Sequence, residues 1–302
     1  MKSLRLPSFA KVNLGLEVLG QREDGYHELR TIFQAIDLHD DVVLTRQPRD
    51  VTVRCDHPLV PNDATNLAVQ AAEALRRHAR IAEGVAIGIR KRIPVAGGLG
   101  GGSSNAATVL VGLDRLWKVG LGRDGLHRLA RALGADVPFF LLGGTALGLA
   151  RGDEVYPLRR QVEGHVVVVD PGIPLSTAAV FRRKDAALTP RENSSSIFYF
   201  VSRDLEGEGA WRFLTNDLEE AALVEAPALA RQVQRIRAVL VREGARLAAL
   251  SGSGSTYFGL FSEADRARRA ESALAAAGFR ACRARTLSLD QYRRAHSVRR
   301  GP

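Results

Sequence analysis

Alternating hydrophobic and polar residues predict a β-strand close to the start of the chain. Val12, Leu14, Leu16 and Val18 occupy every second position, which is the period of a half-buried strand. Lys11 therefore lies on the same face of this strand as residue 13, an asparagine. Further extended segments are expected at residues 31–36, 42–45, 51–54, 85–89 and 145–149.

Hydrophobic residues at helical spacing alternate with these strands. Residues 66–78 form one such segment, with Asn66 as the expected N-cap. Another follows a glycine-rich stretch, with apolar residues at positions 106, 109, 110, 113 and 116 and with Ser103 or Ser104 as its cap. A third is expected at residues 124–133, capped by Asp124 and ended by Gly134.

The second half of the chain continues the mixture of strands and helices. We expect strands at residues 165–169, 247–250 and 256–261, and helices at residues 227–243 and 262–277. A short helix carries Thr177 and Phe181, and residues 184–209 have the composition of a loop. The length of 302 residues suits two domains, which we place at residues 1–155 and 156–302. Their fold class is α+β.

The composition excludes several classes of protein. With 45% hydrophobic and 25% charged residues, the chain resembles an average globular protein. Its two cysteines have no metal-binding spacing, which favours a reducing compartment. Pro7 interrupts any signal-peptide core, and the uncharged residues 93–113 contain too many glycines to cross a bilayer. We therefore expect a cytoplasmic protein.

The net charge of +10 raises the alternative of a nucleic-acid-binding protein. The last 23 residues carry seven arginines and one aspartate, so the rest of the chain has a net charge of only +4. A basic end is usually solvated, and no nucleic-acid recognition motif accompanies it. Binding of nucleic acid through this tail is accordingly the weaker interpretation.

The strongest chemical signal is the segment PVAGGLGGGSSNAA at residues 94–107. Glycines leave backbone N–H groups uncovered, and the N-terminus of the following helix adds unpaired donors and a positive dipole end. Together these features bind phosphate. No lysine precedes Ser103 as in a Walker A loop, and no dinucleotide-binding GxGxxG frame is complete. A flexible linker is the alternative, but a strand and a helix flank the segment.

Five segments resemble, in order, the motifs of the GHMP small-molecule kinases. They are SFAKVNLGL at residues 8–16, GYH at 25–27, the glycine segment, GADVPFF at 134–140 and LSGSGS at 250–255. The match is best with the branch that acts on a cytidine diphosphate-linked methylerythritol, and it extends from residue 8 to about residue 287. The resemblance implies a two-domain α+β GHMP kinase fold with the active site in the interdomain cleft. Residues 184–209 and the arginine-rich end have no counterpart.

The resemblance also implies the residues that bind ATP and transfer its γ-phosphoryl group. Asp136 would be the base that accepts a proton from the 2-hydroxyl of the methylerythritol part, with Lys11 as its partner. Mg²⁺ is expected with the nucleotide, with Ser104 suggested as a ligand because no carboxylate cage is evident. The residues assigned to ATP are Pro94, Val95, Ala96, Gly97, Gly98, Leu99, Gly100, Gly101, Gly102, Ser103 and Ser104, together with Asn66 and Lys91.

The cytidine end of the substrate would bind Asn13, Tyr26, His27, Thr177 and Phe181. Flat aromatic faces stack on a base, and polar edges distinguish cytosine from other bases.

Local structure offers an alternative for most of these assignments. Asp136 could cap a helix, Lys11 could be an exposed strand cation, Asn66 a helix cap and Lys91 a surface charge. SGSGS could supply phosphate donors or form a hairpin turn, and the aromatic residues could be packing residues. The nearest alternative function is a GHMP kinase acting on homoserine, mevalonate or a sugar.

Overall fold

The computed structural model describes residues 2–185, 196–202, 211 and 213–296, and the strands among them form two sheets. The first sheet contains β1 (Ser3–Gln21), β2 (His27–Gln47), β3 (Val51–Cys55), β4 (Gly84–Arg90), β5 (Thr145–Leu149) and β6 (Glu154–Pro157). Its order is β3-β4-β2-β5-β6, with β1 paired to β2. The second sheet has the order β10-β7-β9-β8 and comprises β7 (His165–Asp170), β8 (Leu247–Leu250), β9 (Tyr257–Phe261) and β10 (Arg280–Arg285).

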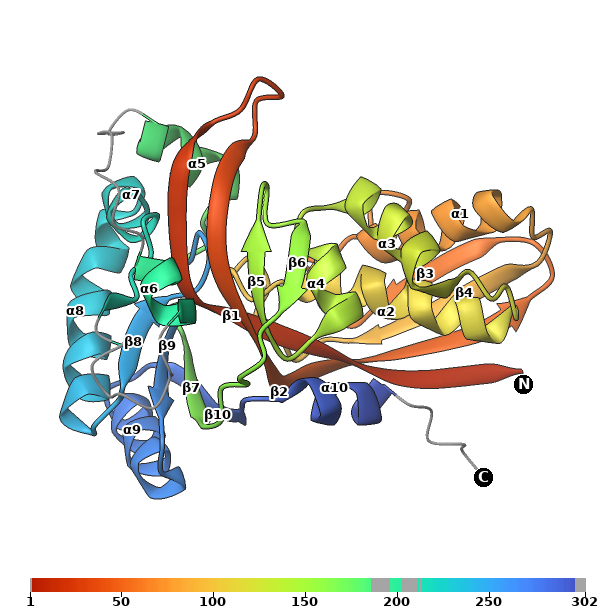
Figure 1. Ribbon diagram of the computed structural model, residues 1–302. Coiled ribbons are helices and arrows are strands. Elements are labelled where there is room, and N and C mark those ends of the chain that lie inside the picture. Colours follow the sequence, from red (N-terminus) through yellow and green to blue (C-terminus); the bar gives the residue numbers. More distant parts are fainter. Residues whose placement is uncertain (1, 186–195, 203–210, 212, 297–302) are drawn as a thin grey trace.

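Two long antiparallel strands, β1 and β2, run from the first sheet into the second half of the molecule (Figure 1). The prediction of separate strands at residues 31–36 and 42–45 is wrong, because both segments belong to β2. The pairing jumps from Phe9 opposite His39 to Ala10 opposite Ile36, so residues 37–38 bulge out of the ladder. The polar interruption in the pattern therefore marks a β-bulge rather than the end of a strand.

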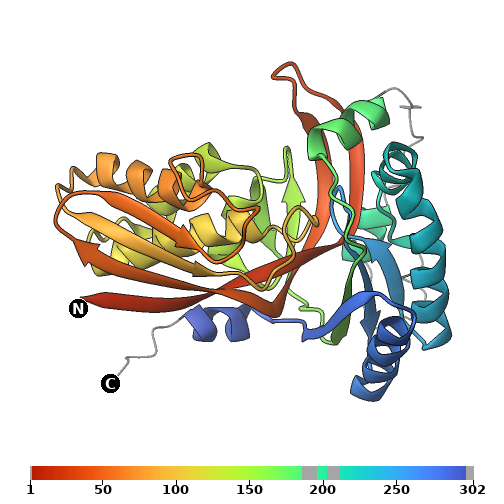
Figure 2. The ribbon, with the colours of Figure 1, turned by 180° about the vertical axis from the view of Figure 1, so that it is seen from behind.

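Helices cover one face of the first sheet (Figure 2). They are α1 (Leu67–Ala79), α2 (Gly101–Leu116), α3 (Gly122–Leu133) and α4 (Val137–Leu142). Asn66 caps α1 as predicted, by accepting a hydrogen bond from the backbone N–H of Ala68 at 3.0 Å. The predicted serine cap of α2 is wrong, because Gly100 adopts a φ of 70° and the helix begins before both serines. Asp124 lies in the first turn of α3 instead of capping it.

The second sheet packs against α8 (Pro227–Arg242) and α9 (Ala264–Ala276), close to the predicted helices. α5 (Thr177–Asp185) is the predicted short helix that carries Phe181, and α7 (Glu219–Glu225) precedes α8. The loop predicted at residues 184–209 contains α6 (Ser196–Ser202), so the prediction is wrong there. Residues 186–195 and 203–209 lie outside the described part.

The arginine-rich end forms α10 (Leu289–His296), which packs on the first sheet. Tyr292 is only 2% exposed, its ring lies 5.4 Å from that of Phe9, and its hydroxyl donates to the carbonyl oxygen of Phe140 at 2.8 Å. The expectation of a solvated tail is therefore wrong for α10, and residues 297–302 lie outside the described part. The domain edge that we predict near residue 155 lies within β6, and its position stays a proposal.

Both cysteines are free thiols, Cys55 being buried and Cys282 half-buried. Among the described residues, no helix has the length and apolar character that crossing a bilayer requires.

Candidate active site

A cavity of about 950 Å³ lies between the first sheet's helices and the second half of the chain. The glycine-rich loop, both long strands, α5 and the turn between β8 and β9 contribute to its wall. Nearly every residue predicted for the site lines this cavity. Those residues are Lys11, Asn13, Tyr26, His27, Asn66, Lys91, Pro94, Val95, Ala96, Gly97, Gly98, Leu99, Gly100, Gly101, Gly102, Ser103, Asp136, Thr177 and Phe181.

Ser104 does not line the cavity, unlike its neighbour Ser103. Its side chain is fully buried, with its hydroxyl 2.8 Å from the hydroxyl of Ser8. Its backbone N–H donates to the carbonyl oxygen of Gly100 at 2.8 Å. Because α2 begins at Gly101, the second serine faces the protein interior, and the suggestion that Ser104 binds the metal disagrees with this geometry.

The glycine-rich loop has a backbone shape that side chains would disturb. Gly98 and Gly100 have φ values of 75° and 70°, in the left-handed region that favours glycine. A Cβ on Gly98 would lie 2.0 Å from the carbonyl oxygen of Ser251, and one on Gly100 would lie 2.7 Å from Cζ of Phe140. The loop can therefore approach its neighbours closely only because these positions lack side chains.

The N-terminus of α2 is open toward the cavity. Gly100 occupies the N-cap position and offers no side-chain acceptor, so the helix starts without a side-chain cap. Gly101, Gly102 and Ser103 line the cavity with the first turn. Backbone N–H groups in the first turn of a helix have no intrahelical partner and carry the positive end of the helix dipole. This end of α2 has the physical character of an anion-binding site.

The SGSGS segment supports the glycine-rich loop. It forms the turn between β8 and β9, in which the N–H of Ser251 donates to the carbonyl oxygen of Thr256 at 3.0 Å. The hydroxyl of Ser251 donates to the carbonyl oxygen of Gly98 at 3.0 Å, and the N–H of Thr256 donates to that of Gly97 at 3.3 Å. The hairpin interpretation is therefore correct, and this hairpin also holds the loop in place.

Lys11 and Asp136 meet at the wall of the cavity. The Nζ of Lys11 lies 3.4 Å from Oδ2 of Asp136, and their side chains are 4% and 34% exposed. Asp136 occupies the N-cap position of α4, but its side chain makes no capping hydrogen bond, so the interpretation as a cap is wrong. Burial of Lys11 likewise contradicts an ordinary exposed strand cation. A carboxylate open to the cavity and a buried cation can hold a hydroxyl group between charges of opposite sign.

Asn13 is oriented by its neighbours on β1 and β2. Its Oδ1 accepts a hydrogen bond from Nζ of Lys11 at 2.6 Å, and its Nδ2 donates to the hydroxyl of Thr31 at 2.7 Å. The prediction that residues 11 and 13 share one face of the strand is confirmed by the first of these contacts. Asn13 thereby fixes the position of the Lys11 ammonium group.

Asp40, which the sequence pattern did not indicate as a site residue, is a fully buried carboxylate next to the glycine-rich loop. It accepts hydrogen bonds from Nζ of Lys91 at 2.6 Å, from the backbone N–H groups of Arg92 and Ile93 at 2.8 and 2.9 Å, and from Nδ2 of Asn105 at 3.0 Å. The interpretation of Lys91 as a surface charge is wrong, because its side chain is 5% exposed. Asp40 was missed because it lies in the polar interval between the strands predicted at residues 31–36 and 42–45, where a charged residue is usually exposed.

Aromatic residues that are distant in sequence from the glycine-rich loop also line the cavity. The rings of His27 and Phe181 stack on each other, with centroids 4.6 Å apart and an interplanar angle of 26°. The two rings are too close to each other to admit a further aromatic ring between them. Tyr26 is 54% exposed, and the hydroxyl of Thr177 lies 2.8 Å from that of Ser253.

Two family models match this chain. The model of the GHMP kinases N terminal domain matches residues 66–144, and the model of the GHMP kinases C terminal matches residues 204–280. A solved homoserine kinase from Cytophaga hutchinsonii has a TM-score of 0.74 at 18% identity, covering 95% of both chains, which reflects a shared fold. The chain is a small-molecule kinase of the GHMP class, as the fold and the cavity indicate.

More similar relatives define the family within this class. Curated 4-diphosphocytidyl-2-C-methyl-D-erythritol kinases from Gloeobacter violaceus and a Synechococcus species are 44% and 42% identical, covering 86% and 91% of this chain and 86% and 90% of those proteins. A solved structure of a 4-(cytidine 5'-diphospho)-2C-methyl-D-erythritol kinase has a TM-score of 0.74 at 38% identity, covering 94% of this chain and 99% of that one. The chain belongs to the 4-diphosphocytidyl-2-C-methyl-D-erythritol kinase family.

Proposed function

We propose that this protein transfers the γ-phosphoryl group of ATP to the 2-hydroxyl of 4-diphosphocytidyl-2-C-methyl-D-erythritol, giving the 2-phosphate and ADP in the non-mevalonate pathway to isoprenoid precursors. One observation carries the proposal. The Lys11–Asp136 pair, the glycine-rich loop and the aromatic group at His27 line one continuous cavity. Membership of the family supports this substrate over that of other GHMP kinases.

Phosphoryl transfer requires alignment of the acceptor and stabilisation of charge more than covalent chemistry by the protein. In the proposed mechanism, the carboxylate of Asp136 accepts the proton of the substrate 2-hydroxyl. The oxygen of this hydroxyl attacks the γ-phosphorus, and the bond between this phosphorus and ADP breaks. The Lys11 ammonium holds the carboxylate of Asp136 in position, since the two groups are 3.4 Å apart. The same positive charge lies close to the oxygens that become more negative during transfer.

The open N-terminus of α2 and the loop before it would hold the ATP phosphates. Their donors are backbone N–H groups, whose positions the surrounding fold fixes before the nucleotide arrives. Asn66 and Lys91 lie on the same wall of the cavity and extend this nucleotide site in the proposal. Lys91 would act as a cation shared between Asp40 and the nucleotide.

Mg²⁺ is part of this proposal only as a companion of ATP. Within the described residues, no group of three or more His, Cys, Asp or Glu side chains is arranged to hold a metal ion. In the proposal, nucleotide phosphates and water would hold Mg²⁺, because this ion retains much of its hydration shell. When bound, it would neutralise charge on the phosphates.

A substrate panel tests the proposed function. With ATP present, we expect ADP formation with the cytidyl diphosphate substrate and at least 100-fold lower kcat/KM with homoserine, mevalonate or galactose. Equal turnover of any of these acceptors would contradict the assignment.

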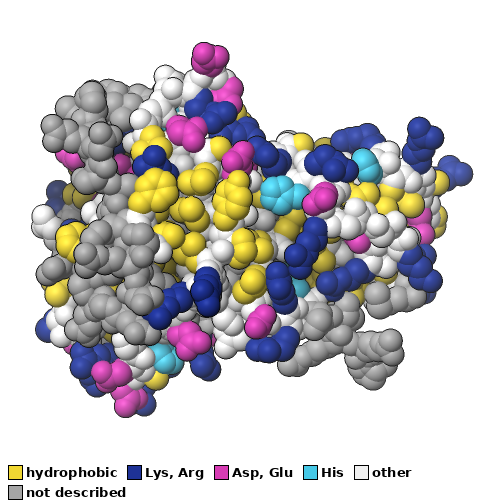
Figure 3. Space-filling model, in the orientation of Figure 1, with side chains coloured by type: hydrophobic (Ala, Val, Ile, Leu, Met, Phe, Trp, Pro, Cys, Tyr) yellow, Lys and Arg dark blue, Asp and Glu magenta, His cyan; other side chains and the backbone are white. Residues whose placement is uncertain are grey.

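Nucleic-acid binding is the competing function, and it requires a basic surface. Figure 3 shows Lys and Arg side chains scattered over both halves of one face and mixed with acidic ones.

A further inference from the structure

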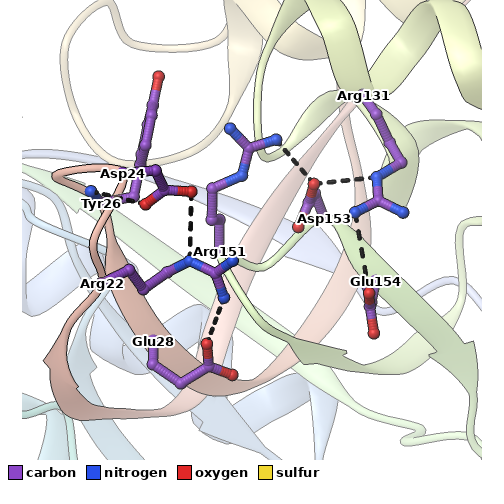
Figure 4. Close-up of polar contacts among 8 residues, drawn as sticks. All are labelled: Arg22, Asp24, Tyr26, Glu28, Arg131, Arg151, Asp153 and Glu154. Carbon is purple, nitrogen blue, oxygen red and sulfur yellow. Dashed lines mark hydrogen bonds and ion pairs between the residues drawn. The ribbon is translucent and has the colours of Figure 1, made fainter.

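Arg151 lies over the ring of Tyr26 at the wall of the cavity. The central carbon of its guanidinium group is 4.7 Å from the centroid of the Tyr26 ring. The Nη2 of Arg151 donates to Oδ2 of Asp153 at 2.8 Å, and its side chain is 26% exposed (Figure 4). A planar cation in this position is attracted by the electron-rich face of the ring.

Asp153 connects Arg151 to the helical layer of the first sheet. It is completely buried, and its Oδ2 also accepts a hydrogen bond from Nε of Arg131 in α3 at 3.0 Å. Burial favours the neutral carboxyl, but the hydrogen bonds and charges of Arg151 and Arg131 outweigh it and lower the pKa of Asp153. The hydrogen bond to Asp153 in turn raises the pKa of Arg151. A continuous series of contacts therefore runs from α3 through Asp153 to the Tyr26 ring.

The turn that carries Tyr26 fixes the backbone of this residue. The N–H of Arg22 donates to the carbonyl oxygen of Tyr26 at 2.7 Å, and the N–H of Tyr26 donates to Oδ1 of Asp24 at 3.1 Å. Arg22 also pairs with Asp24 at 3.3 Å and with Glu28 at 2.5 Å. These contacts hold the main chain, whereas the ring is 54% exposed and has the guanidinium of Arg151 over its face.

We propose that Arg151 is a positioning residue, which holds the Tyr26 ring in the orientation that receives the cytosine base. This inference rests on the proposed function, because it requires a cytidine group in the aromatic part of the cavity. A ring that is already oriented loses less conformational freedom when a base stacks on it, so binding is tighter. Arg151 acts through Tyr26, and Asp153 and Arg131 keep its guanidinium in place.

The geometry favours this role over direct contact between Arg151 and the diphosphate of the substrate. The central carbon of the guanidinium lies over the ring, and its Nη2 is bonded to the carboxylate of Asp153. Asp153 also offsets part of the positive charge of Arg151. A phosphate would therefore meet a cation whose charge is already shared with a buried anion.

The test compares Arg151→Met with the parent protein and with Arg123→Met. Arg123 is an exposed arginine of α3 that does not line the cavity, so this control removes the same charge. For Arg151→Met we expect a KM for the cytidyl diphosphate substrate that is about 3- to 10-fold higher. The kcat and the KM for ATP should stay within twofold of the parent. Asp153→Asn, which keeps the shape of the anchor, should raise the same KM by a smaller factor.

Cytidine and CDP serve as probes that separate the two roles of Arg151. If Arg151 acts through Tyr26, Arg151→Met weakens binding of cytidine and of CDP by the same factor, and it has no further effect in a Tyr26→Ala background. Weaker binding of CDP alone would overturn the proposal in favour of a phosphate contact. An unchanged KM, or the same loss in the Tyr26→Ala background, would also overturn it.

Failure of the proposed function itself gives a different result. In that case the parent protein does not phosphorylate the cytidyl diphosphate substrate, or Tyr26→Ala binds cytidine as tightly as the parent does. If Tyr26→Ala weakens binding and Arg151→Met does not, the proposed function stands and the role of Arg151 is wrong. Thermal unfolding of Arg151→Met and Arg123→Met verifies that both variants are folded.

Discussion

Replacing Gly102 by alanine should stabilise the protein and weaken ATP binding at the same time. Gly102 is the second residue of α2, and a Cβ added to it meets no heavy atom within 4 Å. Alanine is favoured over glycine in a helix by about 0.5–1 kcal/mol, because glycine loses more backbone freedom on folding. For a chain of this size, that difference corresponds to a rise in Tm of about 1–3 °C.

The empty space beside Gly102 is where we propose that a phosphate group rests. A backbone N–H places a phosphate oxygen about 2.9 Å from its nitrogen, whereas a methyl carbon keeps an oxygen about 3.5 Å away. The phosphate must then shift and lose one hydrogen bond to a charged group, which contributes about 1.5–3 kcal/mol. ATP affinity should fall about 10- to 100-fold.

Thermal unfolding with and without ATP measures both effects in one experiment. A ligand at 100 times its dissociation constant stabilises a protein by about 2.7 kcal/mol, so a 100-fold loss of affinity removes most of the ATP-dependent rise in Tm. Gly102→Ala should begin at a higher Tm than the parent and gain less from ATP. Parental ATP affinity in this variant would refute the placement of the phosphates at the start of α2.

Two further glycines provide controls for this experiment. Gly88 lies in β4 and does not line the cavity, and an added Cβ would make an ordinary contact of 3.8 Å with Cβ of Val43. Gly88→Ala should therefore keep the full response to ATP. Gly98 has a φ of 75°, and its Cβ would lie 2.0 Å from the carbonyl oxygen of Ser251. Gly98→Ala should lower both the Tm and the response to ATP.

Three other predictions concern the proton acceptor, acid stability and the last helix. Asp136→Ala should lower kcat about 10²- to 10⁴-fold, because it removes the proton acceptor, while the KM for ATP changes only a few-fold. A coupled assay of ADP release measures both constants. Near-parental turnover would exclude Asp136 from the chemistry. Burial lowers the pKa of His296 from 6.5 to about 4, so the unfolded chain binds the proton first as the pH falls through this interval. The free energy of unfolding should then decrease by up to about 3 kcal/mol between pH 6.5 and pH 4, and urea titrations of His296→Gln should lack this component. Tyr292→Ala should cost about 3–5 kcal/mol in the same assay, whereas Tyr156→Ala, at a ring that is 51% exposed, should cost less than 1 kcal/mol; equal losses would contradict the packing of α10.

Elements with a clear period and a local boundary signal were predictable from the sequence. The strand at residues 145–149 matches β5, and Asn66 caps α1 because the signal for that cap is a single side chain and its own neighbours. The start of α2 was not predictable in this way. Gly100 begins it by adopting a left-handed backbone conformation, which a glycine permits without requiring it.

Long-range packing explains the remaining differences. α10 is rich in arginine, and its position depends on Tyr292 reaching Phe9 and Phe140 from the other end of the chain. Local composition therefore suggested a solvated tail. In the site, Lys91 and Ser104 have partners that are 51 and 96 residues away in sequence, so their burial could not be inferred from neighbouring residues. Arg151 was missed because Tyr26, over whose ring it lies, is 125 residues away in sequence.

Asp40 accounts for how a loop with so few side chains keeps one shape. Glycine-rich backbone loses much conformational freedom when it is ordered, and neighbouring groups must offset this cost before a nucleotide binds. The buried carboxylate of Asp40 holds the entry to the loop through Ile93 and the second turn of α2 through Asn105. On the opposite side Ser251 holds Gly98, and the backbone N–H of Lys11 donates to the carbonyl oxygen of Leu99 at 3.1 Å. Because this last bond involves the residue that also faces Asp136, the phosphate-binding loop and the proposed transfer site are aligned by the same strand.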